Sequence, residues 1–98
     1  MEILASEEFF DKIVDLVREK RHGVARQMLA IALGGMKNPK AVDVLIDLLD
    51  DDDIVGHALI SLKKLKARQA RTPVLKKRNH SNAWVRQQAK RALDSLGG

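Results

Sequence analysis

The sequence predicts an all-α protein, an α/α superhelix (solenoid) of three helical hairpins and six helices. Apolar residues recur at spacings of three and four along most of the chain, which is the period of amphipathic helices. A pattern of small and apolar residues also returns twice, at intervals of about 30 residues. The 98 residues, 45% hydrophobic and 32% charged, fit one folded domain over residues 1–98.

The first hairpin is predicted from an apolar stripe and its end signals. We expect a helix over about Glu7–Arg21 with Ser6 as its N-cap, and a second helix over about Val24–Gly34. Gly23 lies between them, where a left-handed residue stops a helix. The apolar stripe of the first helix comprises Phe9, Phe10, Ile13, Val14, Leu16 and Val17.

The second hairpin begins at an Asn-Pro pair. Asn38 is expected to cap a helix over about Pro39–Leu49, with proline in the first turn. The run Asp50–Asp53 is expected to form a turn in which one of the last two aspartates caps a fourth helix, over about Ile54–Lys66. A calcium loop is the alternative for this run, but the spaced oxygen ligands of an EF-hand are missing.

The third hairpin has the weaker first helix. We expect that helix between Ala67 and Asn79, kinked or restarted at Thr72-Pro73. Ser81 or Asn82 then caps a sixth helix over about Ala83–Leu96. Because the connections are short, sequence neighbours should pack antiparallel as hairpins.

The second helices of the hairpins carry the internal repeat. Ala25, Ile54 and Val85 are equivalent origins, 29 and 31 residues apart. Small residues recur at four and seven positions after each later origin, and a leucine recurs eight positions after all three. These leucines are Leu33, Leu62 and Leu93.

Two segments resemble the HEAT-like repeat family. Residues 32–41 (ALGGMKNPKA) look like its signature A-L-G-x-I-G-D-P-x-A, and residues 84–93 (WVRQQAKRAL) resemble V-R-x-x-A-x-x-A-L of a second helix. The resemblance is to short bacterial-type repeats, found also in phycobilin lyases, and implies repeats at roughly 6–37, 38–67 and 68–97. Val55 replaces the family arginine matched by Arg26 and Arg86, so an Asp–Arg ladder between repeats is expected to be incomplete.

The resemblance also implies a binding surface, because the second helices of HEAT-like stacks line the inner and usually ligand-binding face. The residues expected there are Arg26, Gly56, Leu59, Lys63, Arg86, Gln87 and Lys90. Gly56 inside a helix further predicts a close helix crossing or a contact surface. Trp84 is expected to pack in the core rather than to anchor a partner.

Charge is divided unevenly along the chain. Residues 1–53 hold seven Lys and Arg against twelve Asp and Glu, whereas residues 54–93 hold eleven Lys and Arg and no acid. With Asp94 the net charge is +5. Three interpretations stay open: a solvated basic face, a surface for an acidic protein, or a surface for nucleic acid phosphates.

The residues that carry chemistry are sparse. There is no cysteine, and no histidine has a second metal ligand at helical spacing, so we expect no metal and no cofactor. HEAT-like hydroxylases use His-Glu pairs, and that dipeptide is absent. A lyase or hydroxylase is therefore the least favoured function.

The sequence thus predicts a non-catalytic binding module rather than an enzyme. The expected partner is another protein with an acidic surface, and sequence-independent binding of nucleic acid is the alternative. No apolar run reaches the roughly 20 residues of a membrane-spanning helix, and no signal peptide is recognisable at the acidic N-terminus. A cytoplasmic location is expected, in keeping with the lack of cysteine.

Overall fold

The computed structural model describes residues 2–36 and 38–96, and within these residues every regular element is helical. Three short 3₁₀ helices lie at Lys20–His22, Arg68–Ala70 and Lys77–Asn79. The α-helices are α1 (Glu2–Arg18), α2 (Ala25–Gly35), α3 (Pro39–Leu48), α4 (Val55–Leu65), α5 (Arg71–Lys76) and α6 (Ala83–Ser95). The predicted all-α class with helical hairpins is confirmed.

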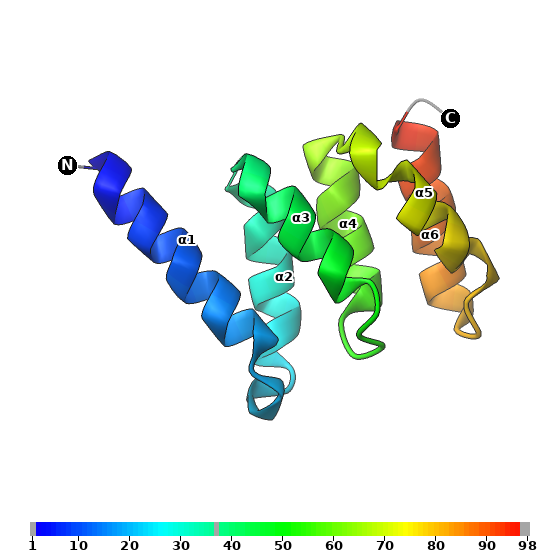
Figure 1. Ribbon diagram of the computed structural model, residues 1–98. Coiled ribbons are helices and arrows are strands. Elements are labelled where there is room, and N and C mark those ends of the chain that lie inside the picture. Colours follow the sequence, from blue (N-terminus) through cyan, green and yellow to red (C-terminus); the bar gives the residue numbers. More distant parts are fainter. Residues whose placement is uncertain (1, 37, 97–98) are drawn as a thin grey trace.

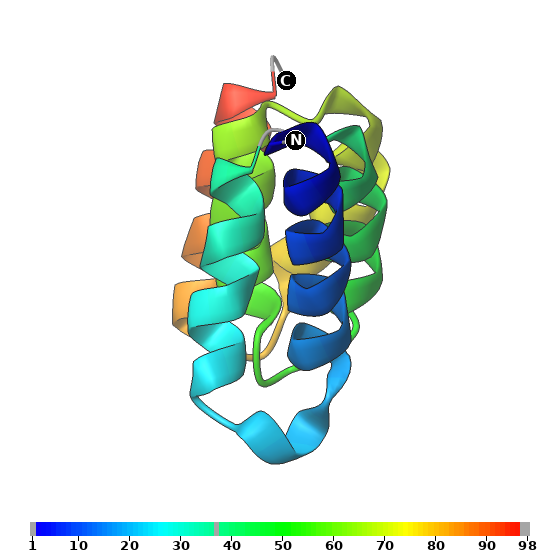
Figure 2. The ribbon, with the colours of Figure 1, turned by 90° about the vertical axis from the view of Figure 1, so that its left-hand side faces the viewer.

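The helices form two layers (Figure 1). α1, α3 and α5 make one layer, and α2, α4 and α6 make the other, as the end view in Figure 2 shows. The repeats stack chiefly through the second layer, where α4 packs between α2 and α6. The distance between α1 and α3 increases toward the N-terminal end of α1 (Figure 1). The result is a flat slab with extents of 42 × 31 × 15 Å.

The helix caps agree with the predictions where the signal is local. Asn38 accepts a hydrogen bond from the Lys40 backbone N–H at 2.9 Å, and Asn82 accepts one from the Trp84 N–H at 2.8 Å. Gly23 has a φ of +54° but a ψ of −125°, so it is not the expected left-handed stop, and it ends the 3₁₀ helix at Lys20–His22 rather than α1. The caps at Asn38 and Asn82 are therefore confirmed.

Two predicted caps are wrong. α1 begins at Glu2, so Ser6 lies inside the helix rather than before it. α4 has Ile54 at its N-cap with no side-chain cap, although Asp52 or Asp53 was expected there. Asp51 is the aspartate whose side chain bonds to the backbone of this turn. Its Oδ1 accepts a hydrogen bond from the Asp53 N–H at 3.1 Å.

Small residues set the spacing of the second helices, as the repeat predicted. Ser61 Oγ donates to the Ala30 carbonyl at 2.6 Å, and a Cβ added to Gly34 would lie 2.8 Å from the Ser61 Cα. α2 and α4 thus cross at a distance that only glycine permits at this position. The equivalent leucines Leu33, Leu62 and Leu93 are all buried.

Candidate functional site

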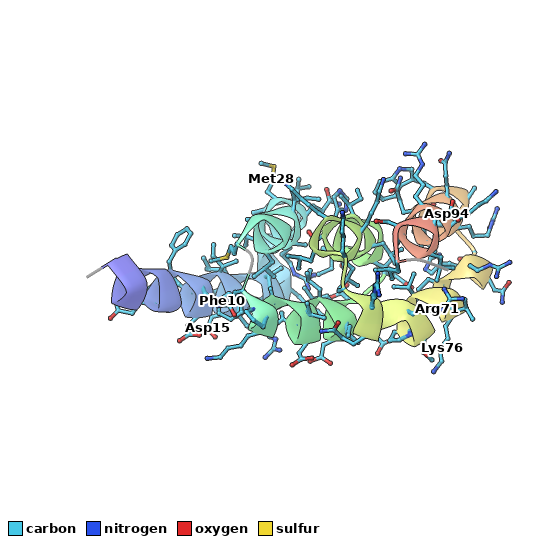
Figure 3. All side chains as sticks on the ribbon, turned by 90° about the horizontal axis from the view of Figure 1, so that it is seen from above. Phe10, Asp15, Met28, Arg71, Lys76 and Asp94 are labelled. Carbon is cyan, nitrogen blue, oxygen red and sulfur yellow. The ribbon has the colours of Figure 1, made fainter. Side chains whose placement is uncertain are left out.

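A strongly charged hollow lies between α5 and α6, at the C-terminal end of the described stack. Its volume is about 600 Å³. We call it the terminal groove and define it by its lining residues, Arg71, Leu75, Arg78, Arg86, Gln87, Lys90, Leu93 and Asp94. Figure 3 shows Arg71 and Asp94 at the same end of the molecule, one from each layer. Four cations and one carboxylate thus surround two leucines.

The cations of this groove are available for a partner. Within the described residues, Arg71, Arg78 and Lys90 are exposed and form no ion pair. Leu75 is 41% exposed and Leu93 is almost covered, so the groove has an apolar floor under a positive rim. Such a surface suits a segment that combines carboxylates with apolar side chains.

Arg86 is held in place by its own repeat. Its Nη1 donates to the His80 carbonyl at 2.8 Å and to the Ser81 carbonyl at 3.0 Å. Both carbonyls lie in the turn before α6, which Asn82 caps. The guanidinium therefore stays at the groove with little freedom to lose when a ligand binds.

Three residues predicted for the binding surface are buried, which corrects that prediction. Arg26 is 1% exposed, Leu59 is fully buried, and Gly56 lies under the indole of Trp84. The residues do share a face with Arg86, Gln87 and Lys90, because they occupy equivalent repeat positions. That face points toward the next repeat rather than to the open surface of the second helices, so the following repeat covers it.

The remaining predicted residues are exposed, but the structure does not gather all of them. Arg86, Gln87 and Lys90 line the terminal groove together. Lys63 is exposed near the end of α4 and lies outside that lining. Arg71, Leu75 and Arg78 join the groove from α5 and were missed as site residues. The sequence feature that could have indicated them is their position on the first helix of the hairpin that also contains Arg86, Gln87 and Lys90.

The acidic turn before α4 links all three repeats. Arg26 Nη2 of the first repeat donates to Asp51 Oδ2 at 2.5 Å. Lys77 Nζ of the third repeat lies 3.8 Å from Asp50 Oδ1, and His80 Nε2 lies 3.0 Å from Asp52 Oδ1. The Arg26–Asp51 pair is one step of the incomplete Asp–Arg ladder that the resemblance implies, whereas the contacts of Asp50 and Asp52 with the third repeat were not anticipated.

The Asp51 carboxyl is the best-held acid of this turn. Its burial raises the pKa, but the hydrogen bonds from Arg26 and from the Asp53 N–H, with the charges of Arg26 and Lys20, outweigh burial. The net effect lowers the pKa of Asp51 below its ordinary value of 3.8. The carboxylate is therefore ionised and paired at neutral pH.

Trp84 has both a packing contact and an open face. Its ring covers Gly56, where an added Cβ would meet the ring at 2.0 Å, and its centroid lies 5.3 Å from that of His57. Burial lowers the pKa of His57. The indole is nevertheless 42% exposed, so it closes the crossing of α4 and α6 from the outside. Of the two expectations at Gly56, the contact where a side chain would clash is the one observed, because the Trp84 ring packs against this glycine.

Other candidate features of the described chain are weaker. A second groove of about 440 Å³ lies beside Asn38 and Pro39 and carries Lys64 and Lys66 on its rim, but none of the predicted site residues lines it. The described residues contain no group of three His, Cys, Asp or Glu placed to hold a metal ion. Among the helices searched, none is long and apolar enough to cross a membrane.

A comparison with known protein families shows the family to which the chain belongs. The family of HEAT repeats matches residues 10–94, which is most of the chain and all three hairpins. The chain belongs to the HEAT repeat family. HEAT repeats form extended surfaces that mediate protein interactions. No curated protein and no solved structure gives a significant match to the chain.

Proposed function

We propose that this HEAT repeat protein is a non-catalytic interaction module that binds an acidic segment of another protein in the terminal groove. The observation that carries the proposal is the clustering of Arg71, Arg78, Arg86 and Lys90 around two leucines, with Asp94 as the one acid in the lining. We place this activity in the cytoplasm, with which a chain lacking cysteine is compatible.

An acidic protein segment fits the groove better than a nucleic acid backbone does. The apolar floor of Leu75 and Leu93 supports apolar side chains of a peptide, whereas phosphates and sugars gain nothing from it. Binding of single-stranded nucleic acid without sequence preference also relies on aromatic stacking. Trp84 is not among the groove residues.

The test uses the full chain as bait in affinity capture, in three forms. The first is unchanged, the second carries Arg86→Glu and Lys90→Glu, and the third carries Lys12→Glu and Arg21→Glu. The two variants have the same net charge, but only the first pair lies in the groove. We expect the unchanged bait and the Lys12→Glu, Arg21→Glu bait to capture acidic proteins. The Arg86→Glu, Lys90→Glu bait should fail to capture them.

The captured protein is then titrated against the same three baits. Reversal in the groove should slow association and reduce the salt dependence of binding, because charge complementarity mainly sets the association rate. Equal affinity of both variants would place the binding surface elsewhere. Preferential capture of RNA or DNA, with a salt slope of about −0.9 per phosphate contact on B-DNA, would favour the nucleic acid alternative.

A further inference from the structure

The end of the stack repeats a docking pair that the first repeat uses internally. Arg26-Gln27 and Arg86-Gln87 stand at the same two positions of their repeats, one and two residues after the origins Ala25 and Val85. The second repeat has Val55-Gly56 there instead. The first and third repeats are therefore alike at these positions, and only the first has a repeat stacked on it.

In the first repeat this pair receives the acidic turn of the next hairpin. Arg26 Nε donates to the Val17 carbonyl at 2.7 Å, and its Nη2 donates to Asp51 at 2.5 Å. Arg26 Nη1 lies 3.8 Å from Asp53 Oδ2, and Gln27 Nε2 reaches the Asp53 carbonyl at 3.4 Å. One guanidinium and one amide thus hold both ends of a three-residue acidic stretch.

In the third repeat the same pair holds nothing from outside its own hairpin. Arg86 Nη1 is tied to the turn before α6 much as Arg26 Nε is tied to the end of α1. Among the described residues, the other guanidinium nitrogens of Arg86 and the amide of Gln87 have no partner. The part of the pair that grips carboxylates in the first repeat is therefore free in the third.

We propose that the terminal groove receives a helical hairpin of another protein whose connecting turn carries carboxylates. That turn pairs with Arg86 and Gln87 as Asp51 and Asp53 pair with Arg26 and Gln27. This inference rests on the proposed function and specifies the partner. Lys90 stands where Ala30 stands in the first repeat, so the docking helix carries an acid opposite it.

A second copy of the chain does not meet this description. Stacked in the same register, the copy would present the turn that precedes its own α2. That turn contains Lys20 and Arg21 with one acid, Glu19, so it would bring net positive charge to Arg86. Like charges at a desolvated contact disfavour the complex. A second copy stacked in this register is therefore disfavoured, and a hairpin with an acidic turn fits the groove better.

The probe is an N-acetylated, C-amidated peptide of residues 46–57, which carries the acidic turn and requires no folded hairpin. It is titrated into the full chain, followed by NMR of backbone amides and arginine Nε–H groups. We expect saturable shifts at the Arg86 Nε–H, the Gln87 side-chain amide and the first half of α6. The same peptide with asparagine in place of its five aspartates should cause no shift of these signals.

Matched variants decide whether Arg86 acts as Arg26 does. Arg86→Ala should raise the dissociation constant of the peptide at least about tenfold, because a charge-assisted pair is lost. Lys63→Ala removes one positive charge outside the groove and should change the affinity less than about twofold. Equal weakening by both variants, or shifts spread evenly over all exposed cations, would overturn the inference.

The outcomes separate this inference from the proposed function. Shifts at Arg71 and Arg78 with Arg86 and Gln87 unmoved would mean that the groove binds acids without the repeat-like pairing. The inference would then fail while the proposed function stands. Absence of any peptide-induced shift in the groove, together with equal capture by the three baits, would refute both.

Discussion

Arg26 and Arg86 occupy the same position in the first and third repeats, yet one is buried and the other is exposed. Arg26 is 1% exposed and pairs with a carboxylate 25 residues further along the chain. Arg86 bonds only to its own turn within the described residues. The difference arises from place in the stack, because the second repeat covers Arg26 and no other described repeat covers Arg86. The same repeat position therefore holds two repeats together at Arg26 and leaves a charged side chain exposed at Arg86.

The leucines at the eighth repeat position should give the largest difference between the middle and the end. Leu62 is fully buried between repeats, whereas Leu93 is 8% exposed at the floor of the terminal groove. Leu62→Ala should lower the free energy of unfolding by about 3–4 kcal/mol, and Leu93→Ala by about 1–2 kcal/mol. Urea unfolding followed by circular dichroism measures both. Equal losses would show that the end of the stack is packed as tightly as its middle.

The two arginines should differ next. Arg26→Ala leaves the Val17 carbonyl and the Asp51 carboxylate without their partner, and should cost about 2–3 kcal/mol. The loss of stability should be smaller than for a fully buried ion pair, because the Asp51 side chain is 16% exposed to solvent. Arg86→Ala should cost less than about 0.5 kcal/mol, since its charge faces water. A large loss for Arg86→Ala would mean that the turn before α6 depends on it.

The Arg26 effect should also depend on pH. The pKa of Asp51 is lower in the folded chain than its ordinary value of 3.8, so the carboxylate stabilises the fold above that pH. The contribution is lost as the pH falls through the folded pKa. We therefore expect the gap between the unchanged chain and Arg26→Ala to be largest near neutrality and to shrink in acid. A gap that grows in acid would contradict the pairing.

The adjacent glycines of α2 should respond in opposite directions. A Cβ at Gly34 would meet the Ser61 backbone, so Gly34→Ala should destabilise the α2–α4 crossing by about 1–3 kcal/mol. Nothing lies within 4 Å of a Cβ at Gly35. Gly35→Ala should therefore stabilise the helix by about 0.5 kcal/mol. Thermal unfolding of the two variants side by side tests this, and a loss in both would assign the effect to helix ends rather than to the crossing.

Sequence reasoning succeeded where the physical cause is local. The period of the apolar residues located all six helices, and the short-range caps at Asn38 and Asn82 were read correctly. Periodicity also placed Arg26, Leu59 and Lys90 on one helix face. It did not reveal which neighbour covers that face, because the pattern is the same whether a repeat or water lies beyond it.

The errors have the same origin. Arg26 was expected on the inner binding surface because the family resemblance implies that placement, and the sequence did not identify its partner Asp51, which lies 25 residues away. The acidic turn was read as a helix cap for the same reason, since its bonds reach into two other repeats. Arg71 and Arg78 line the groove because α5 packs against α6, and the sequence pattern does not show which α5 residues face α6.

A small net effect is expected at the end of α4, between the second and third repeats. Lys66 has a φ of +51°, the left-handed conformation, and the Ala67 N–H bonds to the Leu62 carbonyl at 3.2 Å. Glycine is the residue that this helix ending favours. Lys66→Gly removes a left-handed penalty of about 1–2 kcal/mol. It adds the entropy cost of glycine, about 0.5–1 kcal/mol.

The net stabilisation from Lys66→Gly should therefore lie between about 0 and 1.5 kcal/mol. Lys64→Gly is the matched control, because Lys64 is exposed in the same helix two residues earlier. It should destabilise by about 1 kcal/mol, since its backbone is right-handed and helical. Opposite signs for the same Lys→Gly change in urea unfolding would confirm the conformation at Lys66. A loss of stability in both variants would show that Lys66 is held there by its side chain.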